Sequence, residues 1–293
     1  QFISTLAIGL AAIPFASILH GVWRGRYRYR VVRMEMAFDD LPEAFDGFKI
    51  VQISDLHTGS FDNAEKVQYG LDLINQEEAD ALLFTGDMVN NTADELDDWV
   101  EAYGKLKGKH LKASILGNHD YGDYVGWASE EDKKRNMAKL QATQDEMGWD
   151  LLLNEHRIIE KSGEKLYIAG VENWGKPPFP QKGDLKKALH GVPDDGFTVL
   201  MSHDPSHFDL EVKQHPKRVH ITLSGHTHGM QFGIEIPGII KWSPVKFRYP
   251  KWAGLYEELG CYLYVNRGFG YLAFPGRVGI WPEITSIVLR KKS

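Results

Sequence analysis

The chain has 293 residues, of which 43% are hydrophobic and 25% charged, a composition that suits a folded α/β domain with a sizeable core. Its net charge of −6 argues against nucleic-acid binding across the whole surface, so we expect no stable nucleic-acid partner. The single cysteine, Cys261, excludes an intrachain disulfide and a thiolate zinc site. Composition does not indicate the oligomeric state.

Residues 2–19 form an uncharged, mostly apolar run that is close to the minimum length of a membrane-spanning helix. Three interpretations are open: a transmembrane helix cut at its start, the core of a signal peptide, or an apolar helix packed on its own domain. We favour the first, because five arginines alternate with aromatic residues directly afterwards, as at the cytoplasmic face of a membrane. We therefore expect a truncated membrane-anchor segment over residues 1–22, membrane lipid as a partner, and a folded domain on the cytoplasmic side.

Residues 23–47 are predicted to be a basic juxtamembrane segment that becomes the first strand, since residues 27–31 alternate with period two. From residue 48 the pattern is typical of βαβ units, and strands continue to the end, which favours one domain over residues 48–293. We expect helices beginning at Asp62 and Thr92, each with a glutamate three residues later, and a long polar helix over 129–148. The remaining expected elements are a hairpin of 151–160 with 165–171, a short helix at 184–190, and strands near 261–266 and 283–290.

Five other apolar runs, at 49–54, 81–85, 113–116, 197–202 and 220–224, each end in residues that bind metals or transfer protons. Ligands in open α/β sheets bind beyond the carboxyl ends of the strands, so we expect these side chains to converge. Side chains two residues apart in an extended segment point the same way, which would pair Asp55 with His57 and His226 with His228. The candidates are Asp55 and His57; Asp87; Asn118, His119 and Asp120; His203; and His226 and His228.

The candidate residues offer imidazole, carboxylate and amide groups, which suit Mn, Fe or Zn and suit Ca²⁺ poorly. Two metals are served well by a carboxylate that binds one ion with each oxygen. Asp87 is the natural bridge, because its strand should lie between the others. Two such ions would polarise a phosphoryl oxygen and lower the pKa of a bound water.

The motif set Asp55-Leu56-His57, Gly86-Asp87, Gly117-Asn118-His119-Asp120, His203 and Gly225-His226-Thr227-His228 resembles the calcineurin-like metallophosphoesterase family, over roughly residues 48–290. The resemblance implies a four-layer α/β/β/α sandwich. It also implies that a first metal is held by Asp55, His57, Asp87 and His228, and a second by Asp87, Asn118, His203 and His226. His119 would act as general acid or orient the substrate, with Asp120 beside it. An imidazole can protonate a leaving alkoxide while a carboxylate fixes its tautomer.

The forms of the motifs and the apolar start are further similar to a bacterial, membrane-associated branch of phosphodiesterases. The expected function is therefore two-metal hydrolysis of a phosphoester, preferably a phosphodiester of a lipid- or nucleotide-linked substrate. Two alternatives stay open: a non-catalytic metal-binding scaffold on the same fold, and a soluble nucleotide phosphodiesterase whose apolar start is a packed helix.

Two further stretches have open interpretations. Residues 241–252 are basic and aromatic, and could form a lid that grips a phosphate or an anionic headgroup, or an aromatic loop packed on the sandwich. Arg267 and Arg277 could bind phosphate, but we favour structural roles for both.

Overall fold

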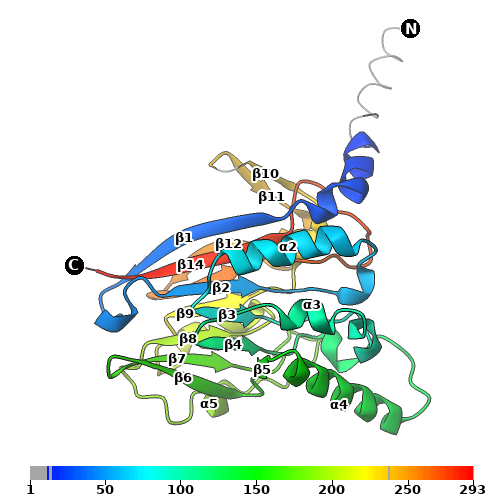
Figure 1. The fold of residues 1–293 in the computed structure, drawn as a ribbon. Helices are drawn as coiled ribbons and strands as arrows, with labels where there is room; N and C mark the ends of the chain where they lie inside the picture. The colour runs from blue at the N-terminus through cyan, green and yellow to red at the C-terminus, as the bar shows by residue number, and fades with distance from the viewer. Residues whose placement is uncertain (1–11, 13–14, 237, 293) are drawn as a thin grey trace.

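The computed structural model describes residues 12, 15–236 and 238–292, and two six-stranded mixed sheets dominate it (Figure 1). The first sheet has the order β1 (Arg30–Phe38), β14 (Glu283–Lys291), β2 (Lys49–Ile53), β3 (Ala81–Phe84), β4 (Leu111–Ser114) and β5 (Asp150–Leu151). The second has the order β12 (Gly254–Glu258), β13 (Cys261–Val265), β9 (Ile221–Ser224), β8 (Thr198–Met201), β7 (Glu164–Gly170) and β6 (Glu155–Lys161). A separate hairpin pairs β10 (Ile234–Ile236) with β11 (Ile240–Trp242).

Successive side chains of a strand point to opposite faces of its sheet, so each face packs in a different layer of the fold. In β3, Leu82 and Phe84 pack in one buried cluster with the longer helices, whereas Ala81 and Leu83 pack in a second cluster shared with the other sheet. The first cluster is covered by α2 (Ala64–Gln76), α3 (Val100–Gly104) and α4 (Glu130–Glu146). On the far side of the second sheet lie the short α5 (Leu185–Ala188) and α6 (Ser206–Leu210). The two mixed sheets with helices outside them agree with the predicted α/β sandwich.

Eight short 3₁₀ helices are also described: η1 (Gly25–Tyr27), η2 (Glu43–Phe45), η3 (Thr58–Ser60), η4 (Ala93–Leu96), η5 (His119–Tyr121), η6 (Val212–Gln214), η7 (His228–Gln231) and η8 (Pro244–Phe247).

The strand order places the C-terminal ends of the predicted strands close together. β2, β3 and β4 are parallel neighbours with β3 in the middle, as expected from the position given to Asp87, and β8 and β9 are parallel in the other sheet. The buried Gln52 joins the two sheets, since its Nε2 donates to the Ser224 carbonyl at 2.9 Å and to Thr85 Oγ1 at 3.1 Å. This bond fixes the end of β2 against the end of β9, so the loops after both strands open toward each other.

Most predicted elements are present, and the differences have local causes. The capping box of Thr92 and Glu95 is confirmed, but it begins η4, and the chain re-forms as α3 only at Val100. The first strand begins at Arg30, after η1, because Tyr27 turns inward to bond Asp62 instead of continuing the alternation. The strands β10, β11 and β12 were not predicted.

The predicted start of α2 is wrong by one residue. Asn63, not Asp62, caps the helix, and its side chain accepts the backbone N–H of Lys66 at 3.0 Å. The Asp62 carboxylate is taken by the Arg26 guanidinium at 2.7 Å and the Tyr27 hydroxyl at 2.6 Å, partners that lie far away in sequence.

Replacing Asn63 with alanine should lower the free energy of unfolding by about 1 kcal/mol, because an amide proton of the first turn loses its acceptor. Asn63→Asp keeps the acceptor at the positive end of the helix and should change stability by less than about 0.5 kcal/mol. Urea titrations followed by circular dichroism measure both. A larger loss for Asp62→Ala than for Asn63→Ala would contradict the assignment of the cap.

The predicted membrane anchor falls mainly on residues 1–11, 13 and 14, which lie outside the described residues, and it stays a prediction. Residues 15–23 are helical. Within the described part of the chain, no helix has both the length and the apolar content needed to cross a bilayer.

Candidate metal centre

Six of the nine predicted residues meet in two adjoining groups that are largely buried. In the first, His228 Nε2 lies 3.0 Å from His57 Nε2 and 3.2 Å from Asp55 Oδ1. One ligand atom from each of these three residues falls within 4.8 Å of the others. Asp55 and His57 are completely buried, so the group is held in a region of low dielectric, where an unpaired charge is costly.

The second group consists of Asp87, His203 and His226, and it meets the same distance limit of 4.8 Å. His203 Nδ1 donates to the Thr85 carbonyl at 2.7 Å, which leaves Nε2 to face Asp87 Oδ2 at 3.1 Å. A hydrogen bond of this kind on one ring nitrogen fixes the orientation of the other, as is usual for imidazoles that bind metals.

Asp87 lies between the two groups. Its Oδ2 is 3.1 Å from His203 Nε2 and 3.6 Å from His57 Nε2, one imidazole from each group. Its Oδ1 accepts the backbone N–H of His119 at 2.8 Å, so the carboxylate is held from a third loop as well. Among the described residues, Asp87 is the carboxylate of one group that lies within 4 Å of an imidazole nitrogen of the other group.

The electrostatics of the two groups differ. Burial lowers the pKa of His57 to about 3, so this imidazole is neutral and its lone pair is available at physiological pH. Burial would also lower the pKa of His203, but the adjacent Asp87 carboxylate outweighs burial and raises that pKa to about 10. The Asp87 carboxylate therefore attracts positive charge strongly, whether that charge is a proton or a cation.

The donor atoms fit divalent cations. Asn118 Oδ1 is buried and has no hydrogen-bond partner among the described residues, although such atoms in proteins are almost always satisfied. Asn118 Nδ2 donates to the Tyr124 hydroxyl at 2.8 Å, which turns Oδ1 away from that partner. Imidazole nitrogen, carboxylate oxygen and amide oxygen together are a donor set that suits Mn, Fe or Zn.

The backbone conformation at these residues was not predicted correctly. Asp55, His57, Asp87, His226 and His228 have φ of 53°, 48°, 60°, 69° and 49°, in the left-handed region that residues other than glycine rarely adopt. Asp55 and His57 converge in the first group although their segment is not extended, whereas His226 and His228 fall in different groups. Backbone strain of this kind, about 1–3 kcal/mol per residue, is found mainly at functional sites, where the surrounding structure holds it in place.

Gly225 permits a close approach between the loops after β9 and β2 at this centre. A Cβ at this position would overlap Ser54 Oγ and Asp55 Oδ2. The same contact lets the His226 N–H donate to Asp55 Oδ1 at 3.0 Å, which ties the loop after β9 to the loop after β2. The lack of a side chain at Gly225 therefore lets another group approach the backbone closely.

Gly225→Ala should lower the free energy of unfolding by about 1–3 kcal/mol, the usual cost of overpacking, and should displace Asp55 from its partners. Gly104→Ala is a matched control at the end of α3, where a Cβ would meet nothing within 4 Å. That control should be neutral or stabilising by up to about 1 kcal/mol. Thermal unfolding and metal content of both variants check the prediction, and equal behaviour of the two would contradict it.

His119 and Asp120 occupy different environments. His119 Nδ1 donates to the Asn90 carbonyl at 2.7 Å, and its ring lies edge-on to that of His57 with centroids 4.9 Å apart. Asp120 was expected to fix the tautomer of His119, but it accepts backbone N–H groups instead. These donors are Asp87 at 2.9 Å, Met88 at 2.8 Å, Val89 at 3.3 Å and Gly117 at 2.8 Å. Asp120 thus shapes the Asp87 loop, and the Asn90 carbonyl orients the imidazole.

Two side chains that had no predicted role contact the second group. The Tyr249 hydroxyl lies 2.7 Å from His226 Nε2, and the buried Asp204 carboxylate is 3.8 Å from the same nitrogen. Asp204 could have been found from the sequence, since it directly follows His203. Tyr249 could not, because it is 23 residues from His226 in a segment whose pairing depends on tertiary structure.

The segment 241–252 is in part the packed aromatic loop that was predicted, and its role as a lid stays a prediction. Tyr249 and Trp252 are buried against the body, whereas the Phe247 side chain is 81% exposed. The two candidate phosphate-binding arginines have structural partners. Arg267 pairs with Glu235 and Glu283, and Arg277 is fully buried, donating to the carbonyls of Gly268 and Gly270 and contacting His228 Nδ1 at 3.2 Å.

Comparison with known proteins agrees with this geometry. The family model described as calcineurin-like phosphoesterase matches residues 48–230. The uncharacterized metallophosphoesterase YkuE of Bacillus subtilis is 31% identical over 255 residues, which is 85% of this chain and 82% of its own. The "transmembrane protein with metallophosphoesterase domain" of Danio rerio is 29% identical over 272 residues, 89% of this chain but 57% of its own length. The chain thus spans little more than half of that relative.

Among solved structures, the NAD nucleotidase of Haemophilus influenzae superposes with a TM-score of 0.51 at 14% identity, over 76% of this chain and 45% of its own, a similarity of fold. The chain belongs to the calcineurin-like phosphoesterase family, as the motifs predicted. It is a metal-dependent phosphoester hydrolase.

Proposed function

We propose that the chain cleaves a phosphodiester, lipid-linked or nucleotide-linked, at a centre of two divalent ions. The first ion would be held by Asp55, His57, Asp87 and His228, and the second by Asp87, Asn118, His203 and His226. The observation that carries the proposal is the position of Asp87 Oδ2, 3.6 Å from an imidazole of one group and 3.1 Å from an imidazole of the other. When bound, such ions supply Lewis acidity toward a phosphoryl oxygen and a nucleophile at neutral pH.

The chain's own residues would supply the proton. Because a carbonyl only accepts, the bond to Asn90 places a hydrogen on His119 Nδ1. The imidazolium form, which carries a second hydrogen on Nε2, would give that proton to a leaving alkoxide and return to the neutral imidazole. Asp120 would act indirectly, by holding the backbone on which Asp87 and the turn before His119 depend.

The preference for a diester rests on charge. A phosphomonoester carries a second negative charge that commonly needs an additional cation. Arg267 and Arg277, two of the candidate cations for that task, are buried with structural partners. A diester, with a single negative charge, is therefore the better match.

An activity screen with defined metals tests the proposal. The purified chain, loaded in turn with Mn, Fe or Zn, should hydrolyse bis(4-nitrophenyl) phosphate faster than 4-nitrophenyl phosphate. Phospholipids, nucleotide-linked lipids and cyclic nucleotides would then define the substrate class. Full metal content with no turnover of any phosphoester would favour the scaffold alternative. Recovery of the full chain in the supernatant after membrane sedimentation would favour the soluble nucleotide phosphodiesterase.

A further inference from the structure

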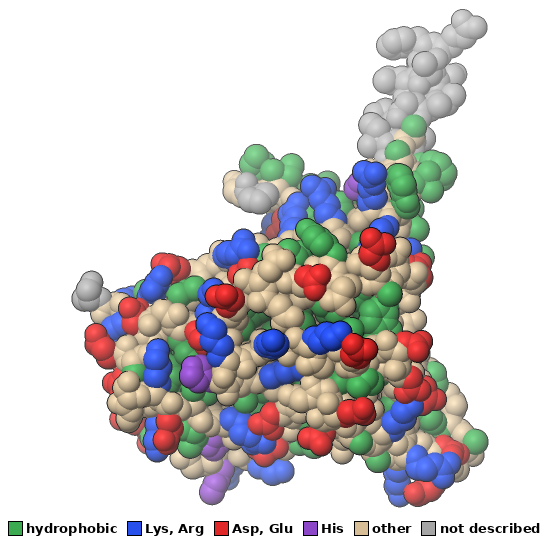
Figure 2. All heavy atoms as spheres, in the orientation of Figure 1, with side chains coloured by type: hydrophobic (Ala, Val, Ile, Leu, Met, Phe, Trp, Pro, Cys, Tyr) green, Lys and Arg blue, Asp and Glu red, His purple; other side chains and the backbone are tan. Residues whose placement is uncertain are grey.

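One end of the molecule carries two apolar projections. The helix of residues 15–23 and the β10–β11 hairpin leave the body at this end (Figure 1). Hydrophobic side chains gather on both (Figure 2). We name this surface the apolar crown, and its most exposed members are Phe15 at 64%, Leu19 at 54%, Trp23 at 66%, Ile234 at 50%, Ile236 at 48% and Ile239 at 80%. A soluble surface rarely concentrates this many large apolar side chains.

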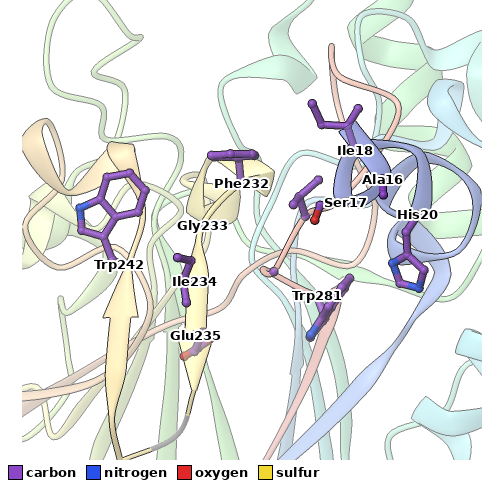
Figure 3. A pocket seen from close by; sticks show the side chains of 12 residues that line it. Ala16, Ser17, Ile18, His20, Phe232, Gly233, Ile234, Glu235, Trp242 and Trp281 are labelled. Carbon is purple, nitrogen blue, oxygen red and sulfur yellow. The ribbon is translucent and has the colours of Figure 1, made fainter. Parts of the chain in front are cut away.

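A groove of about 780 Å³ separates the two projections. Ile18 of the helix and Trp281 line one side, and Ile234 and Trp242 of the hairpin line the other (Figure 3). Its one carboxylate, Glu235, is already neutralised by Arg267. The groove is therefore apolar on both walls and joins the two projections into one surface.

The hairpin is built to present its apolar face outward. Side chains alternate along a strand, so Ile234 and Ile236 share one face of β10 while Glu235 faces the opposite way, toward Arg267. Ile239, in the turn between β10 and β11, is the most exposed of the three isoleucines. No described element covers these side chains, and their exposure is a property of the fold and not of a frayed end.

Cationic side chains follow both projections in the sequence. Arg24 is held over the Trp23 ring at 4.7 Å and Arg28 over the Trp281 ring at 4.8 Å. Lys246, in the η8 turn after the hairpin, lies 5.6 Å from the Phe247 ring. None of the three has an ion-pair partner among the residues that the structure describes. We name these residues the cationic collar, and they contrast with the net charge of −6 on the chain.

Aliphatic side chains lie at the tips, followed by aromatic rings and then by cations that have no ion-pair partner in the described chain. This order matches the polarity gradient of a bilayer with anionic headgroups. Sequence continuity points the same way, since the crown helix continues a run from residue 2 that contains no charged side chain. A protein partner would not require this order of side chains on two separate projections.

We propose that the apolar crown docks on a bilayer that contains anionic phospholipid, with the hairpin tip among the acyl chains and the cationic collar at the headgroups. Docking of this kind needs no catalysis, and it is distinct from anchoring by the first residues of the chain. It would fix the orientation of the domain. Because η7, which begins at His228, runs directly into β10, the loop that carries a metal-centre residue would be held toward the membrane surface.

A fluorescent label on the hairpin tip tests the proposal in the full-length chain. In a Cys261→Ala background, Ile239→Cys is labelled with an environment-sensitive nitrobenzoxadiazole dye. Ile158→Cys is the matched control, since Ile158 is 45% exposed on β6, the edge strand at the opposite end of the second sheet from β12. Vesicles of phosphatidylcholine with phosphatidylglycerol are added, with vesicles of phosphatidylcholine alone for comparison.

The Ile239 label should shift its emission to shorter wavelength and lose iodide quenching when anionic vesicles are added, and the Ile158 label should do neither. A variant with Arg24→Ala and Lys246→Ala should need a higher fraction of anionic lipid for the same shift, because each cation near such a surface strengthens partitioning roughly fivefold. Cosedimentation of the chain with vesicles while the Ile239 label stays quenched would overturn the proposal and leave anchoring by the first residues alone. A shift without vesicles that grows with protein concentration would also overturn it, in favour of a second copy of the chain.

Discussion

Replacing Asp87 with asparagine should remove both metal ions and lower kcat/KM on a phosphodiester by roughly 10³-fold or more, since bound metals contribute several kcal/mol to stabilising the transition state. Asparagine keeps an oxygen that can accept the His119 N–H, so the loop should hold its shape. The variant loses the negative charge beside His57 and His203, and with it the proposed shared ligand of two ions. Elemental analysis and steady-state kinetics on the same preparation measure both effects.

The matched control is Asp80→Asn, at the other end of the same strand. Asp80 precedes β3, and its carboxylate accepts the Lys49 N–H at 2.8 Å, so it too supports backbone from a strand end. This variant should keep its metals and its turnover. Two metals per chain and normal turnover in the Asp87 variant would contradict the bridging role, whereas loss of both in the Asp80 variant would show only that the fold around β3 is fragile.

The sequence was a sufficient guide to which residues would converge, because the signal was a conjunction of patterns. Each candidate lies just beyond a buried strand, and neighbouring parallel strands place their C-terminal loops at the same edge of a sheet. The position of β3 between β2 and β4 also agrees with this reasoning. Local patterns are informative here since strand identity and residue chemistry are both local properties.

The sequence was a poor guide to how those side chains are oriented. The left-handed conformations of Asp55 and His57 depend on contacts with the loops after β3 and β9, and local preference opposes them. Adjacency misled the interpretation of His119 and Asp120. Both lie in the 3₁₀ turn η5, where successive side chains diverge by about 120°, so neighbours in sequence face different partners.

The same limit explains why Tyr249 and the β10–β11 hairpin were missed. A short strand between glycines and a proline carries little periodic signal, and its pairing is settled by the tertiary fold. The contact from Tyr249 to His226 is likewise a consequence of the path that the chain takes around the hairpin. The residues of the centre could thus be identified from the sequence, whereas those that surround it were identified only in the structure.

The second large effect concerns His119, which should contribute to rate without holding a metal. His119→Asn should keep both ions and lose about 10²–10⁴ in kcat on a diester with an alkyl leaving group, the usual contribution of a positioned general acid. The loss should be much smaller on bis(4-nitrophenyl) phosphate, because nitrophenolate leaves without a proton. The dependence of rate on leaving-group basicity therefore separates proton transfer from substrate orientation.

His156→Asn is a suitable control for that experiment, since His156 lies on β6 with Nδ1 bonded to the Ala188 carbonyl at 2.9 Å, in the same kind of contact that His119 makes with Asn90. Its rates should match those of the unmodified chain on both substrates. An equal loss on alkyl and nitrophenyl diesters in the His119 variant would assign the residue to orienting the substrate. Loss of a metal ion in that variant would instead place its imidazole among the ligands, and the proton for the leaving group would then have to come from another residue or from water.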